Sequence, residues 1–503
     1  MAERTTTERS SRGRIVMLVD NTVSGDSRVQ KQARSAAELG WDVILLGRSP
    51  DSKPRRWKIG QSHVRLIPIP RPMSQRRHQF RRSIFRYPLA YPAGRLESYR
   101  LQQARAWRSD LAARRALADA HSPALLTQRL AAKAFGRWVQ VRSGQSTRMR
   151  EHNRERNSPF DRLATRYWQA TMGNRAWRRL DPSVWDHDLP YADLIDRLKP
   201  DIIHANDFRM LGTGARAKLR ARSWGREIAL VWDAHEFLPG LKPRSHPRWH
   251  IALKAQEREY AGVADAVVTV SESLADLLVE THGLRSRPAV VLNAPYAIVA
   301  EGADDRPTLR EVCGVPADQP LLVYSGGAAS QRGLDVMVEA LPELDDVHVA
   351  FVVPRRSDYV NALVDRAEEL GVADRVHVSG YVPYDEVVAY LSTCDVGVIP
   401  IHQWPNHEIA LITKFFEYSH ARLPIVVSEV RTMAEMTRQT GQGEVFRTDD
   451  VTDFVRAVRL VLADPERYRS AYDKPDLLDG WTWEAQATVL DEVYSALTSG
   501  HRP

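Results

Sequence analysis

Residues 321–334 read LLVYSGGAASQRGL, an apolar stretch followed by two glycines, an arginine and a third glycine. The apolar part predicts a buried strand, and the residues after Arg332 predict the start of a helix. Gly326 and Gly327 leave backbone amides open to an anion, and the guanidinium of Arg332 adds a positive charge, so the segment can hold a diphosphate. The alternative is a flexible loop with a surface arginine.

The alternation of apolar strands and helical stretches extends in both directions from this segment. Fully apolar runs separated by amphipathic helices are typical of parallel sheets that are covered on both faces. The pattern therefore predicts an α/β chain with two doubly wound domains. The remaining strands are expected at 14–19, 42–46, 201–204, 229–232, 266–270, 289–292, 348–353, 375–378, 396–400 and 424–427.

The boundary between the two domains is expected at the polar, turn-rich residues 301–307. We predict a first Rossmann-like domain over residues 1–298 and a second over residues 299–478. Residues 479–503 are expected to form a C-terminal helix that packs back on the first domain.

Composition excludes several classes of protein. Of the 503 residues, 43% are hydrophobic, which allows a large core and argues against disorder. No apolar run approaches the roughly 18 residues of a membrane span, and residues 1–14 lack the apolar region of a secretory signal. Cys313 and Cys394 are too few for a disulfide framework or a cysteine zinc site. These features predict a cytoplasmic protein.

The positive charge of the chain is concentrated in one insertion, expected at about residues 71–190 in the first domain. Residues 71–181 contain 25 Lys and Arg against 7 Asp and Glu, a net charge of +18, whereas the whole chain carries +8. Arginines alternate there with aromatic and Ala/Leu-rich stretches, which indicates amphipathic helices. Three interpretations stay open: contact with an anionic membrane surface, a solvated helical appendage without a ligand, or binding of single-stranded nucleic acid, for which no recognition motif is present.

Polar residues follow the strands of the first half, where ligands bind in doubly wound sheets. The loop 20–29 contains Gly25 just before a helix, the third strand ends in the run 204–207, and the fourth ends in Asp-Ala-His-Glu at 233–236. The last run lacks the HExxH spacing of a zinc site, so we predict no metal. These groups either form a site or cap helices and satisfy one another.

The second half places two charged residues beside the end of the strand at 396–400. Lys414 and Glu417 lie three residues apart, on one face of a helix. The ammonium can bind phosphate, and the carboxylate can accept hydrogen bonds from two hydroxyls. The alternative is a solvated ion pair.

Together these motifs resemble the family-4 glycosyltransferases of the GT-B fold. The matching segments are 26–29, 200–205, 233–236, 270–272, 326–333 and 414–418, and the resemblance covers most of the chain outside about residues 70–190. It implies two Rossmann-like domains across a cleft and a nucleotide-diphospho-sugar donor bound chiefly by the second domain. It also implies transfer with retention of anomeric configuration, without a metal or other cofactor.

The resemblance also assigns roles to individual residues. Arg332 and Lys414 correspond to the cations that bind the diphosphate, Glu417 to the carboxylate on the ribose, Gly25 to the first-domain glycine near the phosphates, and His235 to a residue that contacts the sugar. The family often has two glutamates separated by seven residues. Ile409 stands at the first position of that pair, and Glu408 precedes it. Glu408 is the candidate for the missing donor contact, alone or with Asn406 and His407.

The expected function is transfer of a sugar to a glycan or lipid-linked acceptor in cell-surface polysaccharide or glycoconjugate synthesis. The insertion lies on the acceptor side, where it can dock the protein on the inner face of the cell membrane or steer a lipid-linked or anionic glycan acceptor into the cleft. Two alternatives remain: a nucleotide-sugar epimerase or hydrolase of the same fold, and a non-catalytic scaffold.

Overall fold

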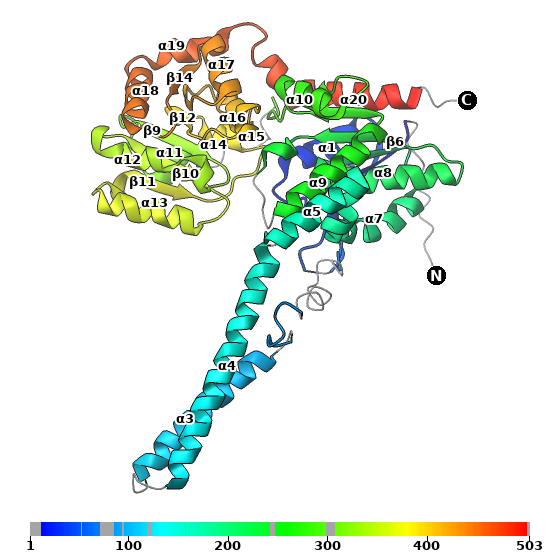
Figure 1. Ribbon diagram of the computed structural model, residues 1–503. Coiled ribbons are helices and arrows are strands. Elements are labelled where there is room, and N and C mark those ends of the chain that lie inside the picture. The colour runs from blue at the N-terminus through cyan, green and yellow to red at the C-terminus, as the bar shows by residue number, and fades with distance from the viewer. Residues whose placement is uncertain are drawn as a thin grey trace, which may run out of the picture. The chain divides into compact units, whose positions relative to one another are not determined.

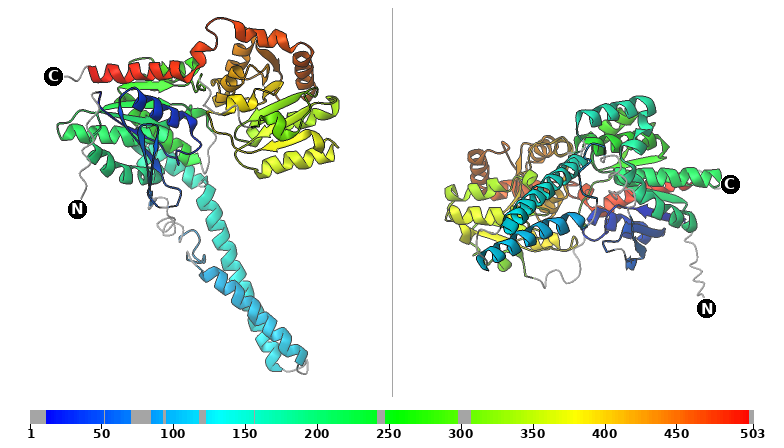
Figure 2. Two further views of the ribbon diagram at one scale, coloured as in Figure 1. Left: turned by 180° about the vertical axis from the view of Figure 1, so that it is seen from behind. Right: turned by 60° about the horizontal axis from the view of Figure 1, so that its bottom comes forward.

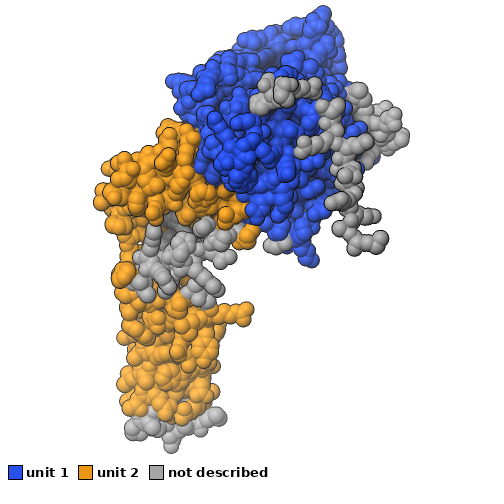
Figure 3. All heavy atoms as spheres, turned by 90° about the vertical axis from the view of Figure 1, so that its right-hand side faces the viewer, with its two compact units in different colours: residues 1–69, 190–241, 260–503 blue, residues 70–189, 242–259 orange. Residues whose placement is uncertain are grey.

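The computed structural model describes residues 12–51, 53–70, 85–92, 95–117, 123–155, 157–241, 247–297 and 307–499. The chain divides into two compact units (Figure 3). Unit 1 comprises residues 1–69, 190–241 and 260–503, and unit 2 comprises residues 70–189 and 242–259. Residues 1–11, and residues 301–306 of the predicted domain boundary, lie outside the described residues.

The first sheet of unit 1 has eight strands in the order β3-β4-β2-β1-β5-β6-β7-β8. All neighbours are parallel except β3 and β4, which form an antiparallel edge hairpin. The strands are β1 (Arg14–Leu18), β2 (Asp42–Arg48), β3 (Arg55–Ile59), β4 (Ser62–Ile67), β5 (Ile202–Asn206), β6 (Ala229–Ala234), β7 (Ala266–Thr269) and β8 (Ala289–Val290).

The second sheet of unit 1 has six strands, all parallel, in the order β11-β10-β9-β12-β13-β14. Its strands are β9 (Leu321–Ser325), β10 (His348–Val352), β11 (Val376–Ser379), β12 (Val396–Ile399), β13 (Ile425–Ser428) and β14 (Gly443–Phe446). Figure 1 shows helices on both faces of this sheet. The predicted fold class, two doubly wound α/β domains, is confirmed.

Three strands were not predicted, and each has a physical reason. Strands β3 and β4 form the sheet edge, so arginines and a lysine alternate with their apolar residues. Strand β14 reads GEVF, too short and too polar to stand out from a loop.

The last helix, α20 (Trp483–Ser499), packs against the first sheet beside α1 (Ser27–Glu38) (Figure 1). Trp483, Leu490 and Tyr494 belong to the core around β1, β2 and β5. The Tyr494 hydroxyl also hydrogen-bonds the buried ring nitrogen Nδ1 of His204 at 2.8 Å. The chain therefore crosses to the second sheet and returns to the first.

Unit 2 is built from helices. Figure 2 shows α3 (Leu96–Leu117) and α4 (Pro123–Glu155) side by side, and α5 (Pro159–Met172) follows. Glu97 of α3 accepts hydrogen bonds from Ser143 and Arg150 of α4, at 2.7 and 2.5 Å. Among the helices described, none combines the length and the apolarity that crossing a bilayer requires.

Candidate functional site

The loop after β9 and the first turn of α16 (Thr413–His420) meet at the Lys414 side chain. Gly326 has φ +123°, and a Cβ added there would lie 2.8 Å from Lys414 Cε and closer still to Nζ. The Lys414 ammonium also lies 5.1 Å from the ring centroid of Tyr324. Only glycine allows both this backbone conformation and this approach of the lysine, so the loop is shaped around the cation.

A cavity of about 350 Å³ opens beside this lysine and is lined from both sheets. It includes five of the predicted site residues. Thr413 and the side chains after β11 line it too, although no sequence pattern indicated them. The lining residues are Gly25, Ser27, Ser325, Gly326, Gly327, Val352, Pro354, Tyr381, Val382, Tyr384, Val387, Thr413, Lys414 and Glu417.

The first domain contributes the start of α1 to the cavity. Gly25 has φ +81°, and the space where its Cβ would point is open. Asp26 caps the helix by accepting a hydrogen bond from the amide of Val29 at 3.3 Å. The partial positive charge of a helix N-terminus therefore lies at the cavity wall.

The two predicted cations lie close enough to influence each other. Burial, and then the charge of Arg332, lower the pKa of Lys414 to about 8. Arg332 ends a short 3₁₀ turn, Ser330–Arg332, and its guanidinium makes no hydrogen bond or ion pair with another described residue. Arg332 is not among the residues that line the cavity, so it acts on the cavity by its charge rather than by contact.

Glu417 lines the cavity one helical turn after Lys414. Burial raises the pKa of its carboxyl, while the charges of Lys414 and Lys31 oppose that rise.

Lys31 comes from α1 of the first domain. Its ammonium donates a hydrogen bond to the Ala294 carbonyl and lies 4.7 Å from the Trp483 ring centroid. Burial lowers the pKa of Lys31 to about 7. Sequence reasoning missed Lys31, although a lysine on the apolar face of α1 is a detectable signal.

A buried ion pair lies behind the strand ends of the first sheet. Arg28 donates two hydrogen bonds to the Asp233 carboxylate, at 2.8 and 2.9 Å, and Gln32 donates a third at 2.6 Å. Burial alone would raise the pKa of Asp233, but Arg28 and its neighbours hold it well below the usual range. Asp233 of the Asp-Ala-His-Glu run is therefore a structural anchor rather than an exposed ligand.

His235 follows that anchor at the end of β6. Its side chain is 27% exposed, and Nδ1 lies 3.9 Å from Asp233 Oδ1, beyond hydrogen-bond distance. Burial works against protonation of His235, but the carboxylates of Asp207 and Asp233 outweigh it and raise the pKa. Asp207 has the unusual φ of +66°, and burial raises its pKa to about 7. The structure thus brings His235 and Asp207 together at the carboxyl ends of β5 and β6, though neither residue lines the cavity.

Glu408 ends the short helix α15 (Pro405–Glu408) of the second domain, which contacts the first domain. The Asn406 side chain accepts a hydrogen bond from the Phe237 amide at 2.9 Å, two residues after His235. The Glu408 carboxylate instead accepts a hydrogen bond from the Arg431 amide at 2.8 Å, at the start of α17 (Arg431–Thr440). Glu408 is absent from the cavity wall. The structure thus gives Glu408 a partner in a neighbouring helix and Asn406 one in the first domain, and neither contact involves the cavity.

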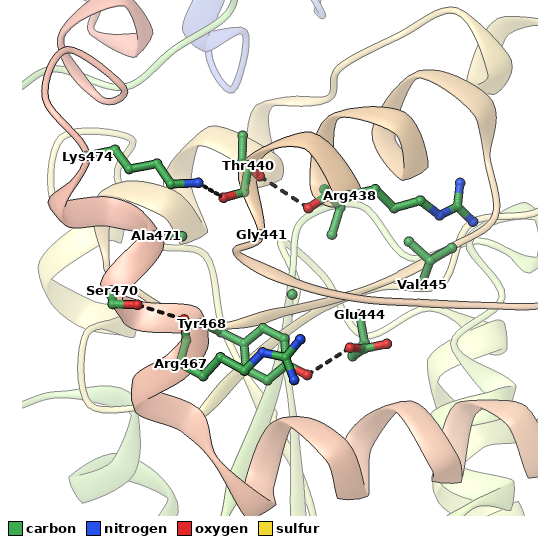
Figure 4. A pocket seen from close by; sticks show the side chains of 12 residues that line it. Arg438, Thr440, Gly441, Glu444, Val445, Arg467, Tyr468, Ser470, Ala471 and Lys474 are labelled. Atoms are coloured by element: carbon green, nitrogen blue, oxygen red, sulfur yellow. Dashed lines mark hydrogen bonds between the residues drawn. The ribbon is translucent and has the colours of Figure 1, made fainter.

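A larger cavity of about 480 Å³ lies elsewhere in the second domain, between α17 and the residues around Tyr468 (Figure 4). Its polar groups largely satisfy one another. Lys474 donates to the Thr440 carbonyl at 2.5 Å, and the Tyr468 hydroxyl donates to Glu444 at 2.7 Å. None of the predicted site residues lines this cavity. In the described part of the chain, no three His, Cys, Asp or Glu side chains are grouped so that they could hold a metal ion.

Comparison with known proteins gives matches over both domains. The family described as "Glycosyl transferases group 1" matches residues 305–474, and "Glycosyltransferase Family 4" matches residues 114–294.

A glycogen synthase of Mycobacterium tuberculosis is 25% identical over 318 residues, which are 60% of this chain and 70% of that protein. A GDP-mannose-dependent alpha-(1-6)-phosphatidylinositol monomannoside mannosyltransferase of Mycolicibacterium smegmatis is 27% identical over 324 residues, 61% of this chain and 81% of that protein. The solved structure of Anabaena HepE in complex with UDP-glucose has a TM-score of 0.56 at 12% identity, covers 96% of this chain and 100% of its own, and shows a likeness of fold.

Proposed function

Since the chain belongs to the family-4 glycosyltransferases of the GT-B type, we propose that it moves a sugar from a nucleotide-diphospho-sugar to a glycan or lipid-linked acceptor. The observation that carries this proposal is the close approach of Lys414 to Gly326 at the wall of a cavity lined from both domains. A half-buried cation beside an open glycine loop is suited to bind a diphosphate.

In this proposal the diphosphate lies against the amides of Gly326 and Gly327 and the ammonium of Lys414. Arg332 adds a second positive charge nearby, and the N-terminus of α1 at Gly25 faces the diphosphate from the first domain. Negative charge builds on the diphosphate as the bond to the sugar breaks. Fixed cations and amides stabilise that charge without reorganising, which lowers the barrier.

Glu417 is proposed to bind the ribose. Its carboxylate lines the same cavity one turn beyond Lys414, and two cations oppose the effect of burial on its pKa. An ionised carboxylate accepts hydrogen bonds from two neighbouring hydroxyls. One of the two cations is Lys31, so a charge from the first domain acts on the proposed ribose contact.

His235 is proposed to contact the sugar or the acceptor at the edge of the first sheet. It is a partly exposed member of the strand-end cluster. Two residues later, the Phe237 amide donates a hydrogen bond to Asn406 of the second domain. We propose transfer with retention on the basis of family membership. Proton NMR of the product during turnover tests this, because retention gives the anomer of the donor.

Donor affinity is expected to fall as the pH rises above about 8, the pKa of Lys414 in the free protein. A bound diphosphate favours the charged lysine, so affinity is full below that pKa. Above it, each pH unit weakens binding about tenfold until the pKa of the complex is reached. Calorimetric titration of a nucleoside diphosphate on both sides of this pH measures the effect. Lys414→Arg keeps its charge and should give a flat profile; an equally flat wild-type profile would contradict the assignment.

The experiment that tests the proposed function starts with thermal shifts in UDP, GDP, ADP and dTDP, since a ligand that binds only the folded state stabilises it. The matching nucleotide sugars are then incubated with the protein, with and without membrane extract, and with and without EDTA. Acceptor-dependent release of nucleoside diphosphate that EDTA leaves unchanged supports a metal-independent transferase. Release without acceptor indicates a hydrolase, conversion of the sugar without release indicates an epimerase, and no turnover with any donor supports a scaffold.

A further inference from the structure

Helix α4 of unit 2 carries large apolar side chains that the protein leaves exposed. Leu126, Leu130, Trp138 and Val141 are exposed by 58, 60, 49 and 52%. At 100° per residue, these four positions fall on one side of the helix. We refer to them, with the cations that lie among them, as the α4 stripe.

The opposite side of the same helix is the packed side. Ala132, Val139 and Ser146 are almost completely buried, and α3 lies against α4. Helix α4 therefore packs against α3 with one side. The α4 stripe is a second, exposed apolar side of the same helix.

The charges on α4 are of one sign. Residues 123–150 contain six Lys and Arg and no Asp or Glu. Lys133, Arg137 and Arg148 are exposed on the side of the α4 stripe, and none of the three has a hydrogen bond or ion pair to another described residue. Long basic side chains among exposed leucines and a tryptophan are the pattern of helices that lie in a membrane interface.

We propose that the α4 stripe is a docking surface for an anionic lipid bilayer. Leu126, Leu130 and Val141 would enter the boundary between headgroups and acyl chains, Trp138 would lie at headgroup level, and the cations would contact lipid phosphates. The proposal concerns where the protein binds and does not depend on the donor chemistry.

Charge and shape favour this partner over two others. A second copy of the chain would bring another segment with a net charge of +18 against the first, so repulsion opposes self-association through this surface. Single-stranded nucleic acid binds by stacking bases on aromatic rings, and three of the four apolar side chains of the α4 stripe are aliphatic. An acyl-chain boundary accommodates aliphatic and aromatic side chains alike.

The test is co-sedimentation of the full chain with vesicles of phosphatidylcholine, with or without one third phosphatidylglycerol. The wild type should sediment with the anionic vesicles and much less with the neutral ones. Leu130→Ser/Trp138→Ser should lower the partition coefficient at least tenfold, because the apolar contacts are lost. Lys133→Gln/Arg137→Gln should lower it about 25-fold on anionic vesicles, since each basic residue near such a surface contributes about fivefold.

A matched control is available on unit 1. Leu219 and Trp224, in and just after α8 (Asp207–Ser223), are exposed by 46 and 59%. Leu219→Ser/Trp224→Ser removes a leucine and a tryptophan of similar exposure outside unit 2, and should leave the partition coefficient unchanged. Circular dichroism checks that every variant folds, and donor-induced thermal shifts should be equal in all of them.

Three results would overturn the proposal. The wild type could fail to sediment with anionic vesicles, the control variant could lose as much binding as the stripe variant, or a single-stranded oligonucleotide could bind α4 while vesicles do not. Each of these leaves the transferase assay unaffected, so failure of the docking surface and failure of the proposed function are distinguishable.

Discussion

Replacing Lys414 by alanine is expected to slow sugar transfer by about a hundredfold to a thousandfold, the usual cost of removing one group that stabilises charge in the transition state. A Cβ at Gly326 would meet the Lys414 side chain, which lines the cavity, whereas Arg332 does not line it. Steady-state kinetics with the donor identified by thermal shift measure the loss. The fall should appear in kcat as well as in kcat/KM, because the charge on the leaving diphosphate grows in the transition state.

Lys474→Ala is the matched control for that variant. Lys474 lines the other cavity of the second domain, and its ammonium donates to the Thr440 carbonyl. Its removal should leave kcat within about twofold of the wild type. A twofold change is far smaller than the tenfold change in rate that about 1.4 kcal/mol of activation free energy would cause. Equal rates for wild type and Lys414→Ala would show that the diphosphate does not lie beside Lys414.

Replacing Arg28 by methionine is expected to lower the free energy of unfolding by about 3–5 kcal/mol, because it leaves the Asp233 carboxylate buried without its counter-ion. Both side chains are almost fully buried, and the two hydrogen bonds between them are 2.8 and 2.9 Å long. Urea denaturation at neutral pH measures the change. The pKa of Asp233 in the folded protein is well below its ordinary value, so this stabilisation is present at neutral pH and is lost as the pH falls through the folded pKa.

A matched control lies on the same helix. Arg34 and Glu38 form an exposed ion pair at 2.9 Å, and such pairs contribute at most about 1 kcal/mol. Arg34→Met should therefore change the stability far less than Arg28→Met. The double variant Arg28→Met/Asp233→Asn should regain part of the loss, because the uncompensated charge is removed. Equal stabilities for Arg28→Met and Arg34→Met would show that the buried pair contributes no more than a surface pair.

The sequence predicted the central strands of both sheets because such strands are buried on both faces and must be apolar throughout. Strand β9, with its run from Leu321 to Ser325, is an example. The edge strand β3 contacts solvent and includes Arg55, Arg56 and Lys58, so its pattern is that of a loop. Local sequence reports burial, and β3 has too little of it to be recognised, whereas the edge strands β8 and β11 follow apolar patterns and were predicted.

The same limit applies to the site. Gly326, Lys414 and Glu417 could be found because they follow strands, and the carboxyl ends of parallel strands gather at one edge of a sheet. Lys31 could not be assigned to the nucleotide end, because it is far from Glu417 in the sequence and its charge acts on that carboxyl only in the folded protein. The contact of Glu408 with the Arg431 amide depends equally on where α17 lies.

The measurement that tests the diphosphate site most directly is calorimetric binding of the stabilising nucleoside diphosphate to two neighbouring glycine variants. At Gly326, a Cβ meets the Lys414 side chain at 2.8 Å and the backbone has φ +123°, whereas at Gly327 nothing lies within 4 Å of the added atom. Gly326→Ala should weaken binding at least tenfold, since it displaces the ammonium or the loop, and Gly327→Ala should stay within about twofold of the wild type. Equal affinities for the two variants would mean that the nucleotide binds somewhere other than between the β9 loop and Lys414.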